Sequence, residues 1–185
     1  MLSEAMIRHV VGPEGARALI EIVQGAWDDY VQEGKLRFHR STRANIVWDY
    51  MAQRSVEVFT DAEGVECVPR EDRPIFVFRG LFAMRPKMHD RAGLTRNYPT
   101  PSQLALTDTG LLGDMPMPQA TFGYILDAAE AGGEQCVIAS PLDDWIIDLD
   151  DLAAGDVSPV KGMLDLPDLD RQWRQVDPIR LRRVE

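Results

Sequence analysis

The stretch that most constrains the fold is the apolar run from Pro74 to Met84, which is rich in β-branched and aromatic residues. Such residues favour strands, and the run is too short to cross a membrane as a helix, which takes about 20 residues. Arg79 and Gly80 interrupt the run, and a glycine inside a strand often marks a bulge. We therefore expect one long, mostly buried strand with a kink or bulge at Gly80.

Two amphipathic helices are expected before this strand. From Glu14 to Glu33, apolar residues recur every three or four positions, which is the period of one helix face. Gly12 and Pro13 come just before this segment and suit the N-cap and the first helical position. A second helix is expected from a cap at Ser41 or Thr42 to about residue 59, because a hydroxyl side chain can accept the first free backbone amides.

Shorter strands complete the expected sheet. They are Val65–Pro69, Gln119–Asp127, Gln135–Ser140 and Trp145–Leu149, of which the last three form an antiparallel meander. Thr100 and Pro101 predict the start of a short helix that ends at about residue 109, with the threonine as its N-cap. Residues 111–118 are expected to form a proline-bounded loop.

The order of the elements indicates an α+β domain, with N-terminal helices packed on one face of a mostly antiparallel sheet. A chain of 185 residues is long enough for one good core, and we assign residues 1–155 to a single domain. Prolines and glycines interrupt the remainder. We interpret residues 156–185 as a Pro-rich C-terminal extension with a basic end.

The net charge of −10 is unevenly distributed along the chain. Residues 99–170 have 1 Lys or Arg against 14 Asp or Glu, whereas residues 35–98 have 12 against 8. Two interpretations stay open: the charges intermix on the folded surface, or an acidic face meets a basic partner. The first thirty residues carry charges throughout, so we expect no signal peptide, no membrane association and a cytoplasmic location.

A cationic segment follows the apolar run directly. Several cations close together after a strand suit anion capture, although no phosphate-binding glycine motif accompanies them. A solvated loop without a ligand is the alternative. We predict an irregular basic loop whose anion- or partner-binding residues are Arg79, Arg85, Lys87, His89, Arg91, Arg96, Asn97 and Tyr98.

An acidic cluster surrounds the last expected strand. The candidate acidic partner face consists of Asp143, Asp144, Asp148, Asp150 and Asp151. Carboxylates at this density can also serve metal-dependent hydrolysis, in which Asp148, Asp150 and His89 would act together. The histidines and the two cysteines, Cys67 and Cys136, lack the spacing of a zinc site. We therefore expect no metal and no cofactor, and both cysteines as reduced thiols.

Three phrases of the sequence, RPKMHDRAGLTRNYPT, LLGDMPMP and TFGYILD, resemble a recurrent pattern in small uncharacterised prokaryotic proteins that are encoded beside helix-turn-helix or zinc-metallopeptidase genes. In that pattern a strand ends in a basic pair, an asparagine, a proline and a threonine open a helix, and a GY(V/I)L strand follows a proline-bounded loop. The resemblance implies an antitoxin-like protein whose partner is the neighbouring gene product. The matching residues are Arg85, Lys87, Asn97, Pro99, Thr100, Gly123, Tyr124 and Leu126.

No catalytic signature stands out, and the serines lack the context of a nucleophile elbow. We therefore expect a non-enzymatic cytoplasmic interaction module, antitoxin-like, that neutralises or regulates a partner protein. Two alternatives stay open: a nucleic-acid-binding regulator that uses the segment from Arg85 to Arg96, and a metal-dependent hydrolase. The net negative charge argues against the first of these, because nonspecific nucleic-acid binders are normally basic. Homo-oligomerisation is also left open.

Overall fold

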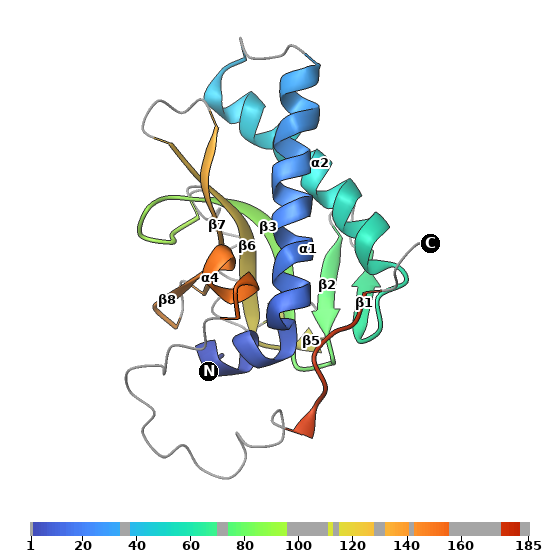
Figure 1. The fold of residues 1–185 in the computed structure, drawn as a ribbon. Helices are drawn as coiled ribbons and strands as arrows, with labels where there is room; N and C mark the ends of the chain where they lie inside the picture. The colour runs from blue at the N-terminus through green and yellow to red at the C-terminus, as the bar shows by residue number, and fades with distance from the viewer. Residues whose placement is uncertain are drawn as a thin grey trace.

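In the computed structural model, helices cover one face of a six-stranded sheet (Figure 1). The structure describes residues 2–33, 38–69, 74–95, 111–112, 115–127, 132–140, 143–155 and 175–181. The helices are α1 (Glu4–Gln32), α2 (Arg40–Phe59) and the short α4 (Leu149–Ala153). The expected α+β class, with N-terminal helices on one face of a mostly antiparallel sheet, is confirmed.

The strands of the main sheet have the order β1-β2-β3-β6-β7-β8. Neighbouring strands run antiparallel, except that β3 and β6 in the centre are parallel. The expected first strand and the β6-β7-β8 meander are confirmed, whereas the sequence pattern gives no sign of the parallel pair. The bounds are β1 Val65–Val68, β2 Ile75–Phe78, β3 Phe82–His89, β6 Gln119–Leu126, β7 Gly133–Ser140 and β8 Trp145–Asp148. Within 111–118, expected to be a loop, β4 (Leu111–Leu112) pairs with β5 (Met115–Pro116).

The apolar run forms a hairpin, so the expectation of one kinked strand is wrong. β2 ends at Phe78, and β3 returns antiparallel from Phe82. Arg79 and Gly80 both have positive φ, at 50° and 68°, and the Leu81 amide donates to the Phe78 carbonyl at 2.9 Å. Two successive residues with positive φ are typical of a tight hairpin turn. An arginine occupies the first of these positions, where asparagine or glycine usually signals the turn.

The basic segment that was expected to be an irregular loop begins as a strand, up to His89. Arg85, Lys87 and His89 lie on β3, and their alternation with residues that pack on the helices follows the period of two that a strand requires. Residues 90–95 then form a turn in which the Asp90 carboxylate accepts the amides of Ala92 and Leu94 at 2.9 and 3.0 Å. The predicted Thr100-capped helix lies outside the described residues.

α1 begins earlier than expected and is bent where its start was expected. Ser3 caps the helix by accepting the Met6 amide at 3.2 Å. Gly12 has non-helical angles (φ 61°, ψ 179°), and Pro13 follows it. Positive φ suits glycine, and proline lacks the amide that a helix interior needs. The expected boundary at Gly12 is therefore a kink, and the helical residues before it are a feature that the sequence analysis missed.

α2 packs between α1 and the β1 side of the sheet (Figure 1). Its N-cap is His39, which makes no side-chain cap hydrogen bond, so the prediction of a cap at Ser41 or Thr42 is wrong by two or three residues. The Trp48 indole donates to the Pro86 carbonyl of β3 at 3.0 Å. These contacts fix α2 on the sheet.

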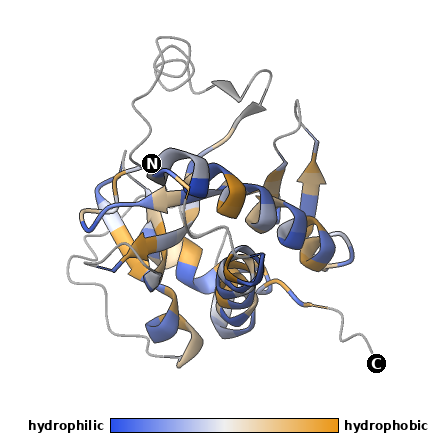
Figure 2. Cartoon of the chain, turned by 90° about the horizontal axis from the view of Figure 1, so that it is seen from above, coloured by the Kyte–Doolittle hydropathy of each residue, from blue (hydrophilic) through white to orange (hydrophobic). Residues whose placement is uncertain are grey.

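The main core lies between the helices and the sheet. It includes an aromatic group in which Phe59 of α2 contacts Phe76 and Phe78, with ring centroids 5.3 and 5.6 Å apart. Figure 2, which looks from above, shows hydrophobic residues on the strands and hydrophilic residues along much of the helices. The opposite face of the sheet is also buried, at Val137 and Ala139 for example. The sheet is therefore buried on both faces at these positions.

Residues 175–181, which we name the C-terminal strap, lie across the N-terminal half of α1. Ile179 is buried, its amide donates to the Val10 carbonyl at 2.9 Å, and Arg180 forms a backbone bridge with Glu63. The part of residues 156–185 that the structure describes thus packs on the 1–155 domain.

Candidate functional site

The predicted basic residues do not form one cluster. Arg79, at the β2–β3 turn, donates to the Pro178 carbonyl at 2.9 Å and lies 3.5 Å from a Glu63 carboxylate oxygen. Arg91 pairs with Glu134 at 3.0 Å, while Arg85 and Lys87 lie on β3. Arg96, Asn97 and Tyr98 lie outside the described residues. Arg79 thus holds the C-terminal strap, and two of the predicted cations are engaged by carboxylates.

His89 lies in the interior and is 2% exposed. One ring nitrogen, Nε2, lies 2.8 Å from the Thr121 hydroxyl, and that hydroxyl lies 3.3 Å from the Ala139 carbonyl. The Thr121 hydroxyl donates its proton to that carbonyl and therefore accepts the Nε2–H of His89. Burial lowers the pKa of His89 to about 4, with a smaller opposing effect from Asp90 and a further lowering by Lys87. A neutral, buried imidazole is poorly suited to hold an anion at the surface.

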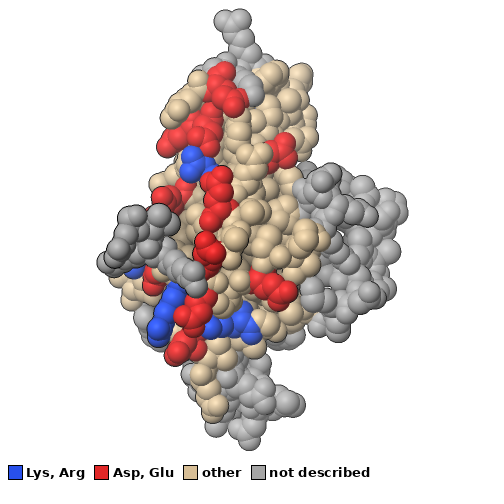
Figure 3. Space-filling view, turned by 90° about the vertical axis from the view of Figure 1, so that its right-hand side faces the viewer, with Lys and Arg blue, Asp and Glu red and all other residues tan. Residues whose placement is uncertain are grey.

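Several residues of the predicted acidic face have local structural roles. Asp143 accepts the Ser140 hydroxyl at 2.8 Å. Asp148 is the N-cap of α4, where it accepts the Asp150 amide at 2.8 Å and the Gln135 side-chain amide at 2.5 Å. Asp144, Asp150 and Asp151 are exposed. Acidic side chains also follow one another down another face of the molecule, with few cations between them (Figure 3).

The residues proposed for metal-dependent hydrolysis do not converge. His89 is on β3 and Asp148 on β8, with β6 and β7 between them. Strands lie about 4.8 Å apart, so the two backbones are separated by about 14 Å. The described residues contain no group of three or more His, Cys, Asp or Glu side chains that could hold a metal.

A groove of about 350 Å³ lies beside the C-terminal half of α1 and is the best candidate site. We name it the α1–β7 groove. Its lining residues come from α1, from β7 and the glycine before it, and from α4. They are Val23, Gln24, Trp27, Asp28, Val31, Gly132, Gly133, Glu134, Gln135, Cys136 and Asp150.

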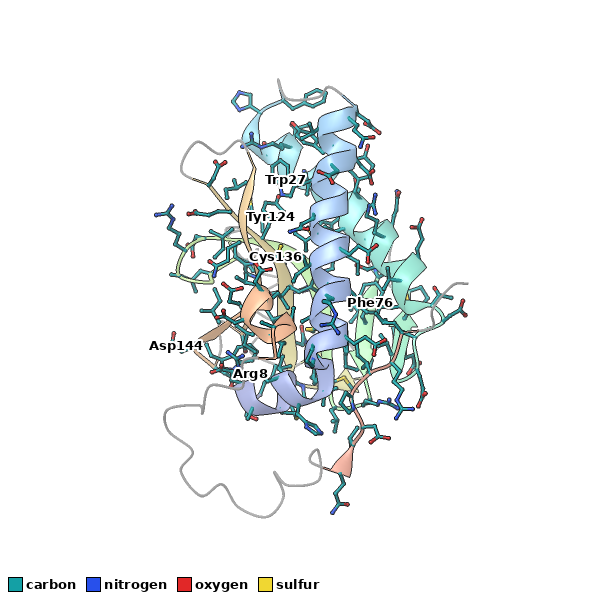
Figure 4. All side chains as sticks on the ribbon, in the orientation of Figure 1. Arg8, Trp27, Phe76, Tyr124, Cys136 and Asp144 are labelled. Atoms are coloured by element: carbon teal, nitrogen blue, oxygen red, sulfur yellow. The ribbon has the colours of Figure 1, made fainter. Side chains whose placement is uncertain are left out.

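Trp27, which lines the α1–β7 groove, belongs to an aromatic group. The Trp27 ring makes edge contacts with Tyr30 and Tyr124, with centroids 5.7 and 5.2 Å apart. Trp27, Tyr124 and Cys136 follow one another along the β7 side of α1 (Figure 4). Trp27 is only 7% exposed, yet its indole Nε1 has no hydrogen-bond partner. A buried donor without an acceptor is costly and uncommon.

The groove has an acidic rim. Asp28, Glu134 and Asp150 come from α1, β7 and α4 respectively, and the one ion pair that the structure gives for these three joins Glu134 to Arg91. Asp28 and Asp150 are both exposed. The rim therefore favours a cationic ligand and disfavours an anionic one.

Cys136 lines the same groove but is not activated for chemistry. Burial, with smaller contributions from the charges of Asp150 and Asp148, raises the pKa of its thiol to about 12. Since the thiolate is the nucleophile, a thiol that stays protonated at neutral pH is inert. Both cysteines are free, and burial also raises the pKa of Cys67. The groove is thus equipped for binding, and nothing in its described lining activates a nucleophile.

A second, larger hollow of about 510 Å³ lies where the C-terminal strap meets the residues after α2. Its lining includes Glu63 and Arg180, whose main chains already pair with each other. None of its lining side chains has a buried polar atom without a partner. The α1–β7 groove is therefore the stronger candidate.

Of the predicted site residues that the structure describes, Asp150 alone lines the α1–β7 groove. The sequence placed Trp27 on the apolar face of a helix, where core packing is the usual role. Gly132-Gly133 indicated only a chain reversal. The useful signal was the combination of a tryptophan in one element and two successive glycines in another, but their proximity depends on the tertiary structure.

No family model matches the chain, and no curated protein or solved structure compared with it is significantly similar. The antitoxin-like resemblance therefore stays a prediction. One of its residues has a structural explanation: a Cβ on Gly123 would overlap the Lys87 carbonyl oxygen on the neighbouring strand. No helix among the described residues is long and apolar enough to cross a membrane.

Proposed function

We propose that this protein is a cytoplasmic interaction module that binds a basic segment of a partner protein in the α1–β7 groove. The observation that carries the proposal is a buried, unpartnered Trp27 N–H in a groove with an acidic rim. Interface centres commonly contain aromatic residues surrounded by a polar rim. An antitoxin-like role, in which the bound partner is neutralised, agrees with this arrangement and comes from the resemblance alone.

Binding is a better account of the groove than catalysis. The described lining offers carboxylates, amides, a tryptophan and a protonated thiol. A catalytic site usually contains a nucleophile next to a base that activates it. Within the lining, no such pair is present.

Co-expression with the neighbouring gene product tests the proposal. We expect the two proteins to co-purify, and the double variant Asp28→Asn plus Asp150→Asn to reduce the amount recovered. Asp49→Asn plus Asp144→Asn is the matched control, because it removes the same charge from exposed positions outside the groove lining. Loss of toxicity of the neighbour on co-expression would support the antitoxin-like role.

Two results would contradict the proposal. A neighbour that does not co-purify would remove the proposed partner. Equal recovery with the groove variant and the control would show that any complex forms through another surface.

A further inference from the structure

We propose that the α1–β7 groove recognises a Lys or Arg residue within an extended partner segment through two contacts. Trp27 Nε1–H donates to a main-chain carbonyl of that segment, and the cationic side chain lies against Asp28 and Asp150. This inference rests on the proposed function and specifies the chemistry that the groove selects.

The first step concerns the unpartnered indole. Three tryptophans, Trp27, Trp48 and Trp145, lie among the described residues. Trp48 donates to the Pro86 carbonyl at 3.0 Å, and Trp145 donates to the Leu2 carbonyl at 2.8 Å. Trp27 Nε1 has no acceptor although the atom is buried. The fold therefore uses a main-chain carbonyl to satisfy two of these indoles and leaves the third available for a ligand.

The second step concerns access to this nitrogen. Gly133, at the start of β7, lies beside this nitrogen, since a Cβ on it would be 3.3 Å from Trp27 Nε1. Gly133 is exposed and has no side chain to block the approach. The indole nitrogen is buried in the free protein, so the proposed contact requires a small displacement of the main chain at this glycine. A methyl group at position 133 would fill the space beside Trp27 Nε1 and prevent an acceptor from reaching the N–H.

The third step concerns the charge of the acceptor. Phosphate and carboxylate groups are strong acceptors, but the rim carries Asp28, Asp150 and Glu134, which repel them. A neutral carbonyl meets no such repulsion. Glu134 already pairs with Arg91. Asp28 and Asp150 attract a cation, although the charge of Asp28 also acts on Arg54. A peptide that carries Lys or Arg supplies both groups in one ligand.

The fourth step concerns the shape of the ligand. The other half of α1 already binds an extended segment, the C-terminal strap, in which Ile179 packs against Gly15 and the Leu181 amide donates to Glu14 at 3.2 Å. The strap combines main-chain hydrogen bonds with a buried side chain, and a glycine permits the close approach. The α1–β7 groove offers the same combination, and its volume is at the small end of ligand sites, so it suits one or two residues.

An NMR titration of the ¹⁵N-labelled full chain tests this inference. The probe is the blocked tripeptide acetyl-Ala-Arg-Ala-amide, with the glutamine analogue as the neutral comparison and ethylguanidinium as a cation without a carbonyl. We expect the arginine peptide to move the Trp27 indole N–H resonance in a saturable way. The Trp48 and Trp145 indole resonances serve as internal references, and Trp27→Phe assigns the Trp27 resonance among the four tryptophans of the chain.

Comparisons between the peptides and between the variants separate the Trp27 hydrogen bond from the charge contact with Asp28 and Asp150. We expect the glutamine peptide to bind about fivefold more weakly, since exposed ion pairs contribute modestly. Asp28→Asn plus Asp150→Asn should weaken the arginine peptide by a similar factor, whereas Asp49→Asn plus Asp144→Asn should not. Gly133→Ala should abolish the shift of the Trp27 resonance, because its methyl group covers the N–H. Ethylguanidinium should leave that resonance in place.

A Trp27 resonance that stays fixed with the arginine peptide overturns the inference, wherever else the peptide binds. A shift that persists in Gly133→Ala also overturns it. If the groove variant still abolishes co-purification of the neighbouring gene product in either case, the proposed function stands and only the specified chemistry fails.

Discussion

The two halves of α1 offer similar binding surfaces, but among the described residues the chain itself occupies only one of them. The N-terminal half, near the Gly12 kink, is covered by the C-terminal strap, whose Ile179 is 1% exposed. The C-terminal half borders the α1–β7 groove, where Val31 is 45% exposed and Trp27 Nε1 has no partner. At each half a glycine lies against a buried side chain: Gly15 of α1 against Ile179 of the strap, and Gly133 of β7 against Trp27 of α1.

The two halves of α1 differ in whether their polar groups have partners within the described chain. At the covered half, His9 lies 2.8 Å from the Val176 carbonyl and Glu14 accepts the Leu181 amide. At the groove, a donor and two exposed carboxylates point to a ligand supplied from outside. The strap therefore packs as part of the fold, whereas the groove is the surface that we propose for recognition.

A substitution in the C-terminal strap is expected to change the free energy of unfolding the most. Ile179→Ala should lower the free energy of unfolding by about 2–5 kcal/mol, because it removes a fully buried branched side chain and leaves a cavity. Val31→Ala, in the exposed wall of the groove, should change it by no more than about 0.5 kcal/mol. Urea unfolding of the two variants and the wild type measures both values. Equal losses in the free energy of unfolding for Ile179→Ala and Val31→Ala would contradict the distinction between the two halves of α1.

His89 is expected to have a smaller effect on the free energy of unfolding. This effect depends on pH and does not involve either half of α1. The pKa of His89 is lowered from 6.5 to about 4 by burial, so the unfolded chain takes up a proton at a higher pH than the folded chain does. Stability should be fully present above about pH 6.5 and should fall as the pH decreases toward about 4. At pH 5 the loss should be about 2 kcal/mol relative to pH 7.

Unfolding of His89→Gln from pH 7 to pH 5 checks this expectation. The variant should lose most of the pH dependence in this window, whatever its overall stability. His39→Gln is the control, because His39 is exposed and its removal should leave the dependence unchanged. An unaltered pH dependence in His89→Gln would contradict the assignment of a neutral, buried imidazole.

The sequence predicted correctly those elements that residues close together in the chain determine. The apolar period of three and four gave α1 after Gly12, and apolar runs bounded by glycines gave the β6-β7-β8 meander. The β2–β3 hairpin was missed because its turn begins with Arg79, a residue rarely found at positive φ. The parallel pairing of β3 with β6 was missed because it joins segments far apart in the chain.

The candidate site could be predicted only in part, for the same reason. Charge counting indicated an acidic surface, and Asp150 does line the groove. Asp148 belongs to the same sequence cluster but caps α4, and the cap is recognisable only when the helix is known. The predicted cation Arg79 holds the strap because the chain end returns to it from a distance of 99 residues. The sequence therefore shows which residues are charged, but the role of each charged residue depends on the tertiary structure.

Photo-crosslinking in cells tests the central claim, that the α1–β7 groove binds a basic segment of a partner, most directly. A photoreactive amino acid placed at Val31, inside the groove lining, is compared with the same residue at Asp144, outside it. We predict a crosslinked partner from position 31 alone, with Lys or Arg in the crosslinked segment, and its loss in Asp28→Asn plus Asp150→Asn. Equal crosslinking from both positions, or a crosslinked segment that is acidic or without a cation, would contradict the claim.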